Sequence, residues 1–432
     1  MPKIWLGIIA IAVTIFTILL RLTGGLQGLE LTALDIYFQQ RPTDIDPRIT
    51  IITIDESDIQ TIGQFPLSDR ILARSLDALI RYQPRVIGLD LYRDLPVPPG
   101  NAQLQQLLAS TSNIIAIKKV VGAKIPPPPL LDKLGRVGFA DRIIDDDGAI
   151  RRALMSVRND NTIERSFALK LALEYLQAQN ITPQPLANTN SHIQLGKTVL
   201  TPFHPYDGGY VRADAGGYQT LINYRGTLDR FSHYSITDLL ADNIPAEVVS
   251  NRVILIGSTA ATISDLSPTP YSRWTKSNRQ MAWVTIHANI VSQLLGAAID
   301  ARAMLRTISE VREWSCILIG ATVGAYLSWR LKFLRLGAIA LAVIIGTISI
   351  SYWAFLQGWW LPIIPVAIAI IVAAIAVVTV TQKQLAAMQL KETLKQLIIL
   401  CESQPTVKKI ALELLQQGES QKNRELIERL VS

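Results

Sequence analysis

The chain has 432 residues, and its composition indicates a protein that is partly embedded in lipid. Hydrophobic residues make up 49% of it and charged residues only 18%, whereas soluble domains are closer to a quarter charged. The formal net charge of +7 does not indicate nucleic-acid binding, because the basic residues form no long run and many flank apolar segments. The two cysteines, Cys316 and Cys401, exclude a disulfide framework and paired-cysteine metal sites in the large middle region.

The first apolar segment, residues 4–20, contains no charge and lies between Lys3 and Arg21. A signal peptide usually has a shorter apolar region that ends at an A-x-A-like cleavage site. Here Arg21 is followed by Leu-Thr-Gly-Gly, which matches such a site poorly. We therefore expect an uncleaved membrane anchor over residues 1–22.

Short β-branched runs alternate with helical patterns in the middle region. Residues 49–54 and 85–91 are predicted strands, and the apolar spacing over 69–82 predicts an amphipathic helix that Ser68 can cap. The later predicted elements are a helix over 101–109, a strand over 113–121, a helix over 166–177, a strand over 252–257 and a helix over 284–295. This alternation predicts an α/β domain with a mainly parallel sheet.

Three further apolar segments follow, at residues 314–329, 336–355 and 361–381. Each approaches the ~20 residues that a helix needs to cross the hydrocarbon core, so four transmembrane helices are expected. None of the four segments contains Asp, Glu, Lys, Arg or His. Ion and substrate paths through membranes usually require such groups, so the sequence argues against a transporter.

The loops between these segments predict the orientation. The loop 330–335 is strongly basic, whereas the loop 357–360 is uncharged and contains two tryptophans. The positive-inside rule places the basic loop and the tail in the cytoplasm, and hence the middle region outside it. The expected organisation in a plasma (inner) membrane, with both termini cytoplasmic, is an N-terminal anchor (1–22), an extracytoplasmic domain (23–312), three transmembrane helices (313–382) and a short cytoplasmic helical tail (383–432).

Four ordered blocks between about residues 25 and 300 resemble the CHASE2 family of extracytoplasmic sensory domains. The blocks contain Arg41, Asp55-Glu56, Phe65-Pro66, Asp69-Arg70 and Asp90; Gly138, Asp141, Asp145, Gly148 and Arg151-Arg152; Asn223 and Arg225; and Gly257, Asp265, Thr269-Pro270, His287 and Asn289. The resemblance implies a receptor module that has one anchor before it and three spans after it. Family members feed a cytoplasmic output such as a histidine kinase, a cyclase or a protein kinase.

Residues 383–432 are too few for such an output domain, which needs on the order of 100 residues. We therefore expect a separate cytoplasmic partner. Leu390, Leu394, Leu397 and Cys401 lie on one helix face. The tail is either a solvated helical extension or a segment for docking or homodimerisation.

Acidic residues at predicted strand ends are the leading candidates for ligand binding. Asp55 and Glu56 follow one strand and Asp90 ends the next, and we expect these two parallel strands to be adjacent in the sheet. Ligands of open α/β sheets bind beyond the carboxyl ends of the strands. Their carboxylates could hold a ligand or cation, act as acid and base, or simply cap helices. The full candidate set is Asp55, Glu56, Arg70, Asp90, Asn223, Arg225, Asp265 and His287.

The other motifs have simpler explanations. Residues 145–148 lack the alternating ligands of an EF-hand, so a tight turn is expected there. Asn223 and Arg225 could bind an anion or fix a strand end, and His287 fits a hydrogen-bonded structural histidine better than a metal ligand. We expect no metal, no cofactor and no catalytic centre. The leading hypothesis is a membrane receptor for an unknown extracytoplasmic ligand; the alternatives are an exported hydrolase and a non-catalytic envelope scaffold.

Overall fold

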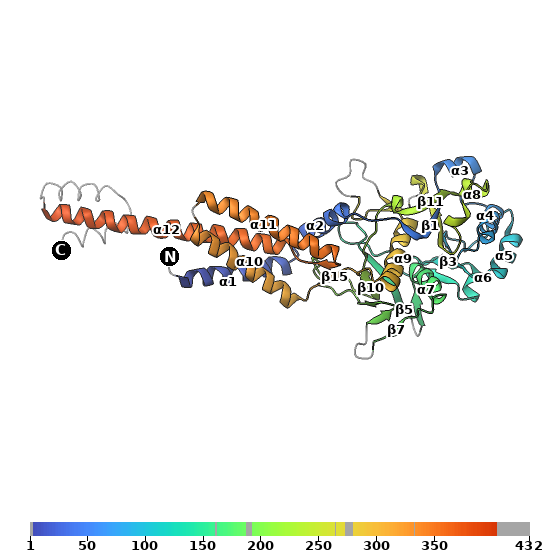
Figure 1. Ribbon diagram of the computed structural model, residues 1–432, viewed down its shortest axis with the longest axis horizontal. Coiled ribbons are helices and arrows are strands. Elements are labelled where there is room, and N and C mark those ends of the chain that lie inside the picture. Colours follow the sequence, from blue (N-terminus) through green and yellow to red (C-terminus); the bar gives the residue numbers. More distant parts are fainter. Residues whose placement is uncertain are drawn as a thin grey trace. The chain divides into compact units, whose positions relative to one another are not determined.

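The computed structural model describes residues 3–159, 162–186, 192–263, 265–272, 280–331 and 333–403. The contacts among these residues divide the chain into two compact units (Figure 1). The α/β domain consists of Leu19–Glu313 together with Ile345–Pro365. The helical unit consists of the described residues of Met1–Ile18, Trp314–Ile344 and Val366–Ser432.

A six-stranded sheet, parallel throughout, forms the centre of the α/β domain in the order β11-β1-β12-β2-β3-β4. Its strands are β1 (Asp46–Ile54), β2 (Val86–Asp90), β3 (Ile114–Lys118), β4 (Val137–Phe139), β11 (Phe231–Ser235) and β12 (Val253–Ser258). The predicted α/β fold with a mainly parallel sheet is confirmed. The expectation that β1 and β2 are adjacent in the sheet is wrong, because β12 pairs with both of them and lies between them.

Both faces of this sheet are buried. In β12, Val253 and Leu255 belong to one apolar core, and Ile254 and Ile256 belong to the other. Successive side chains of a strand point to opposite faces, so an uninterrupted apolar strand needs helices on both sides. The first face is covered by α7 (Phe167–Gln177) and α9 (Trp283–Asp300), and the second by α4 (Asp69–Arg81), α5 (Asn101–Ser110), α6 (Pro129–Lys133) and α8 (Ile236–Leu240).

Smaller elements complete the domain. The helix α2 (Gln27–Gln40) was not predicted from the sequence, and it buries Leu34 and Phe38 in the first core. The short helix α3 (Glu56–Ile62) follows β1 directly. The minor strands are β5 (Arg152–Asn159), β6 (Thr162–Arg165), β7 (Gln184–Pro185), β8 (Ile193–Leu195), β9 (Thr198–Leu200), β10 (Tyr218–Leu221), β13 (Leu266–Ser267), β14 (Met281–Ala282), β15 (Arg306–Thr307) and β16 (Trp359–Trp360).

Four long helices, α1 (Lys3–Leu22), α10 (Glu310–Arg330), α11 (Phe333–Leu356) and α12 (Ile364–Ser403), contribute to the helical unit. Within the described residues, three segments are long and apolar enough to cross a membrane, namely Ile4–Leu22, Gly337–Leu356 and Ile364–Gln396. The expected span at 314–329 lies within α10, whose first turn carries Glu310 and Glu313. Its crossing of the membrane stays a prediction.

Small residues bring α10 close to α12 inside the helical unit. Ala321 and Ala325 of α10 pack with Ala369 and Ala373 of α12 in one apolar cluster. A Cβ atom added at Gly324 would lie 2.2 Å from the Ile370 carbonyl oxygen, so the backbones of the two helices nearly touch there. Close approach through small residues is the common way for membrane helices to pack.

Candidate ligand-binding site

A cavity of about 260 Å³ lies at the carboxyl edge of the central sheet, and we call it the strand-edge cavity. Its lining includes Asp90 and Ser258, the last residues of β2 and β12, and Ile117 near the end of β3. Loop residues Arg142 and Asp265 and the first residue of α9, Trp283, complete much of its wall. This is the edge at which open α/β sheets bind ligands, because the loops after parallel strands diverge there.

The carboxyl group of Asp90 is buried at this edge without hydrogen bonds that would offset the cost of its burial. Its side chain is 1% exposed, and neither carboxyl oxygen has a hydrogen-bond partner among the described residues. Burial raises the pKa of Asp90 well above its usual value; the carboxylate of Asp265 raises it further and the guanidinium of Arg142 opposes the shift. Asp90 therefore favours the neutral acid.

His287 lies beside Asp90, with its Nε2 atom 3.7 Å from Asp90 Oδ1. The ring packs edge-on against Phe167 and Trp283, with both pairs of centroids 4.9 Å apart. Burial, and then the charge of Arg142, lower the pKa of His287 to about 3, so the imidazole is neutral. The expectation of a hydrogen-bonded structural histidine is wrong, because within the described chain neither ring nitrogen has a hydrogen-bond partner.

Arg142 and Asp265 form an ion pair in the cavity wall. The Arg142 guanidinium also lies 4.8 Å from the centroid of the Trp283 ring and donates to Ser267 Oγ at 3.3 Å. The paired side chains remain 31% and 28% exposed, so this part of the cavity wall is accessible to solvent. Neither Arg142 nor Trp283 was a sequence candidate; the only local signal for Arg142 was its position directly after the block 138–141.

The remaining acidic candidates make internal contacts. Asp55 caps α3 in a reciprocal capping box with Asp58, and Glu56 accepts hydrogen bonds from the amide and hydroxyl of Thr262. Arg70 is exposed in the first turn of α4. The structure thus brings Asp90, Asp265 and His287 together and gives Asp55 and Glu56 structural partners.

Asn223 and Arg225 are likewise engaged within the fold. Asn223 donates to the Ala303 carbonyl at 2.6 Å and accepts from Arg41 at 2.6 Å. The Arg225 guanidinium donates to Ser292 Oγ at 2.8 Å and lies 3.3 Å from the Asp46 carboxylate. These contacts match the strand-fixing interpretation of the motif better than the anion-binding one.

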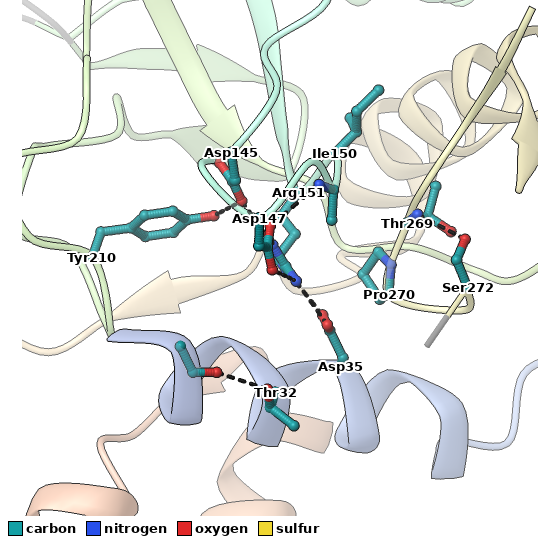
Figure 2. A network of polar contacts seen from close by, with 12 residues as sticks. Thr32, Asp35, Asp145, Asp147, Ile150, Arg151, Tyr210, Thr269, Pro270 and Ser272 are labelled. Carbon is teal, nitrogen blue, oxygen red and sulfur yellow. Dashed lines mark hydrogen bonds and ion pairs between the residues drawn. The ribbon is translucent and has the colours of Figure 1, made fainter. Parts of the chain in front are cut away.

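A second polar cluster, the Arg151 network, lies between α2 and the turn at residues 145–148 (Figure 2). Arg151 is 1% exposed and forms ion pairs with Asp35 at 2.7 Å, Asp147 at 2.8 Å and Asp145 at 3.0 Å. Asp145 also accepts a hydrogen bond from the Tyr210 hydroxyl at 2.7 Å. The predicted tight turn is confirmed by the bond from the Gly148 amide to the Asp145 carbonyl at 2.8 Å.

A third cluster, the junction cluster, consists of Arg21, Glu30, Gly208, Glu313 and Ile364. Arg21, near the end of α1, donates to the Glu313 carboxylate in the first turn of α10 and to the Gly208 carbonyl. Glu30 of α2 accepts a hydrogen bond at 2.8 Å from the amide of Ile364, the first residue of α12. The ends of three long helices are therefore bonded within the α/β domain.

Comparison with known families supports the sequence resemblance. The model described as "CHASE2 domain" matches residues 10–326, which is well over half of the chain. The match includes the strand-edge cavity, the Arg151 network and most of the junction cluster. No curated protein and no solved structure matches the chain.

Proposed function

Because the chain belongs to the CHASE2 domain family, a family of sensory domains, we propose that it is an integral membrane receptor. In this proposal residues 23–312 of the α/β domain lie outside the cytoplasm and detect a ligand in the strand-edge cavity. The helices then pass the signal to a separate cytoplasmic partner, or to a second copy of the chain. They do so through the extension of α12, which is the part of this helix from residue 383 onward. The basic loop at 330–335 and the uncharged loop at 357–360 support this orientation.

Two hydrogen bonds, linked to each other and to the cavity by short stretches of chain, support signal transfer. Arg142 lines the cavity, and Asp145, three residues later, accepts a hydrogen bond from Tyr210. Two residues before Tyr210, the Gly208 carbonyl accepts a hydrogen bond from Arg21. A ligand that moves the Arg142 loop thereby acts on the ends of α1 and α10.

The mechanism is a shift between two arrangements of these contacts. A ligand shifts such an equilibrium only as far as it binds one arrangement better than the other. Buried ion pairs suit this task, because they have discrete bonded partners and cannot deform continuously. Spatial continuity alone does not demonstrate coupling, so coupling has to be measured.

Orientation is tested by labelling single cysteines in intact cells, with Cys316 and Cys401 replaced by serine. A membrane-impermeant maleimide should label Glu247→Cys, an exposed site of the α/β domain. Lys391→Cys, on the exposed extension of α12, should react only after permeabilisation. The reverse labelling pattern would refute the extracytoplasmic location of the domain.

Coupling is tested by hydrogen-exchange mass spectrometry on the full chain in lipid nanodiscs. Tyr210→Phe removes the hydroxyl bond to Asp145 and should speed amide exchange at the starts of α10 and α12. The matched control is Tyr218→Phe, which removes a 2.8 Å bond to the Leu200 carbonyl that takes no part in the proposed transfer. Equal exchange at both helix starts in the two variants would contradict the proposed transfer.

A further inference from the structure

We propose that the strand-edge cavity binds a small organic cation, with a primary ammonium group against Asp90 and an apolar body along Phe65, Ile117 and Trp283. This inference deepens the proposed receptor function and rests on it, because it names the chemical class of the signal. The charges, the hydrogen-bonding groups and the walls of the cavity all favour this class.

Apart from Asp90, each charged side chain that lines the cavity has an oppositely charged neighbour, although Nε and Nη1 of Arg93 form no hydrogen bond within the described chain. Arg142 forms an ion pair with Asp265, and Arg93 Nη1 lies 3.6 Å from Asp69 Oδ1. Among the residues that the structure describes, Asp90 has only the imidazole of His287 as an ion-pair neighbour, and that ring is neutral. A monocation beside Asp90 would balance the charge that Asp90 carries once it is ionised.

The electrostatic field of the side chains around the cavity favours a cation over an anion. Tyr92, in the cavity lining, has a pKa raised to about 12 by burial and then by the carboxylates of Asp90, Asp141 and Asp265. The Arg142 guanidinium opposes this shift only in part. An anionic ligand would meet the same carboxylates, and burying it there would be costly.

The hydrogen-bonding groups select the kind of cation. Both carboxyl oxygens of Asp90 lack a donor within the described residues, and a buried carboxylate is stable only when it is paired and hydrogen-bonded. A primary ammonium offers three N–H donors, whereas a quaternary ammonium offers none. Binding would shift Asp90 from its neutral to its ionised form and release one proton to solvent.

The walls of the cavity suit an apolar body of modest size. About 260 Å³ lies near the lower end of the volumes of small-molecule sites. The apolar part of the wall comes from Phe65, Leu91, Ile117, Ile263 and Trp283. A compact aromatic or branched amine fits these dimensions.

The test uses the full-length protein in lipid nanodiscs and three probes that share one aromatic body: 2-phenylethylamine, 2-phenylethanol and phenylacetate. Titration calorimetry at neutral pH should show the amine binding at least about 10-fold more tightly than the alcohol or the carboxylate. Titrations in two buffers of different ionisation enthalpy should show that protons are released when the amine binds but not when the alcohol binds.

Asp90→Asn keeps the shape of the neutral carboxyl and should therefore fold. It should weaken amine binding by about 10-fold or more, abolish proton release and leave alcohol binding within about 2-fold. Asp94→Asn removes a nearby charge outside the cavity lining and should bind the amine as the wild type does. The comparison of the three probes on the wild-type protein tests the proposal even if neither variant folds.

Three results would each overturn the proposal: equal affinity for amine and alcohol, no amine binding at about 10 mM, or amine binding that survives Asp90→Asn. None of them would decide the receptor function, because the labelling and exchange experiments above use no probe. Conversely, a failure of those experiments would leave amine binding in the cavity as an independent observation.

Discussion

The Glu30 carboxylate on α2 accepts a hydrogen bond from the backbone amide of Ile364 at 2.8 Å and so satisfies one donor at the start of α12. The second carboxyl oxygen of Glu30 has no hydrogen-bond partner among the described residues. Burial raises the pKa of Glu30 to about 8; the nearby Glu313 carboxylate raises it further, and Arg21 and the Ile364 amide oppose the shift. The start of α12 is thus bonded to a carboxyl group that titrates near neutral pH.

We expect Glu30→Gln to remove a pH dependence of stability. The folded pKa lies above the ordinary value of 4.5, so the folded state binds the proton more tightly than the unfolded chain. The resulting stabilisation is complete below about pH 4.5 and is lost as the pH rises through about 8. At about pH 9 the variant should exceed the wild type by on the order of 2–4 kcal/mol.

The measurement is the free energy of unfolding across this pH range, with the full chain in nanodiscs. Gln keeps an oxygen acceptor for the Ile364 amide, so the variant isolates the titration. Glu247→Gln, at an exposed position, should keep the wild-type profile. A wild-type stability that does not decline between about pH 6 and pH 9 relative to Glu30→Gln would contradict the prediction.

Arg151 should be the most costly residue of its network to remove. Arg151→Met removes the countercharge that Asp35 and Asp145 share, although Asp145 keeps its ion pair with Arg152 at 2.9 Å. This loss should cost about 3–5 kcal/mol. Arg158→Met, on the exposed end of β5, the strand that directly follows Arg151, should change stability by no more than about 0.5 kcal/mol.

Urea unfolding followed by tryptophan fluorescence measures both variants. Combining Arg151→Met with Asp35→Leu should recover part of the loss, because replacing both partners of a buried pair is often tolerated. Similar losses for Arg151→Met and Arg158→Met would show that the buried ion pairs contribute little to stability.

Local sequence patterns predicted many helices and strands of the α/β domain, because the residues that determine these elements lie within or next to them. The β-branched run at 49–54 is β1, and Ser68 caps α4 by accepting a bond from the Ile71 amide, as expected. Helix α2 was missed because Glu30 and Asp35 make its buried face look polar. The ion pair with Arg151, 116 positions away, offsets the cost of burying the Asp35 charge.

The sequence predicted only some of the residues of the strand-edge cavity, because the others are brought there by contacts between distant parts of the chain. Asp90, Asp265 and His287 were candidates, and the strand-end rule placed Asp90 at the correct edge of the sheet. The insertion of β12 between β1 and β2 could not be inferred from local periodicity. The contact between Arg142 and Trp283 likewise depends on long-range topology.

His287→Phe should leave the domain as stable as the wild type, or more stable, at neutral pH. It removes two buried nitrogens that lack hydrogen bonds within the described chain and can keep the ring contacts with Phe167 and Trp283. Replacing an unpartnered polar group by an apolar one of similar shape is nearly neutral or stabilising, here by about 1 kcal/mol.

The free energy of unfolding at acidic pH, which we call the acid branch of the stability profile, provides a second test of His287. Its folded pKa of about 3 lies below the ordinary 6.5, so the unfolded state binds the proton more tightly and stability falls as the pH drops from about 6.5 towards 3. Both His287→Phe and His287→Asn should reduce this fall, but only His287→Asn should lose stability at neutral pH. An unchanged acid branch in both variants would contradict a neutral, buried His287.

The contact between α10 and α12 should be intolerant of side chains at Gly324. A Cβ atom added there would lie 2.2 Å from the Ile370 carbonyl oxygen, so Gly324→Leu must push the two helices apart. Overpacking of this kind costs about 1–3 kcal/mol. In α11, Gly346 has no atom within 4 Å of an added Cβ, which makes Gly346→Leu a matched control within another long apolar helix.

Thermal unfolding of the full chain in nanodiscs should show a lower midpoint for Gly324→Leu and a midpoint near the wild-type value for Gly346→Leu. A disulfide between cysteines introduced at Ala321 and Ala369, which share an apolar cluster, should form in the wild-type background with Cys316 and Cys401 replaced by serine. It should form less readily with Gly324→Leu, because the helices are further apart. Equal midpoints and equal crosslinking would show that α10 and α12 do not depend on this close approach.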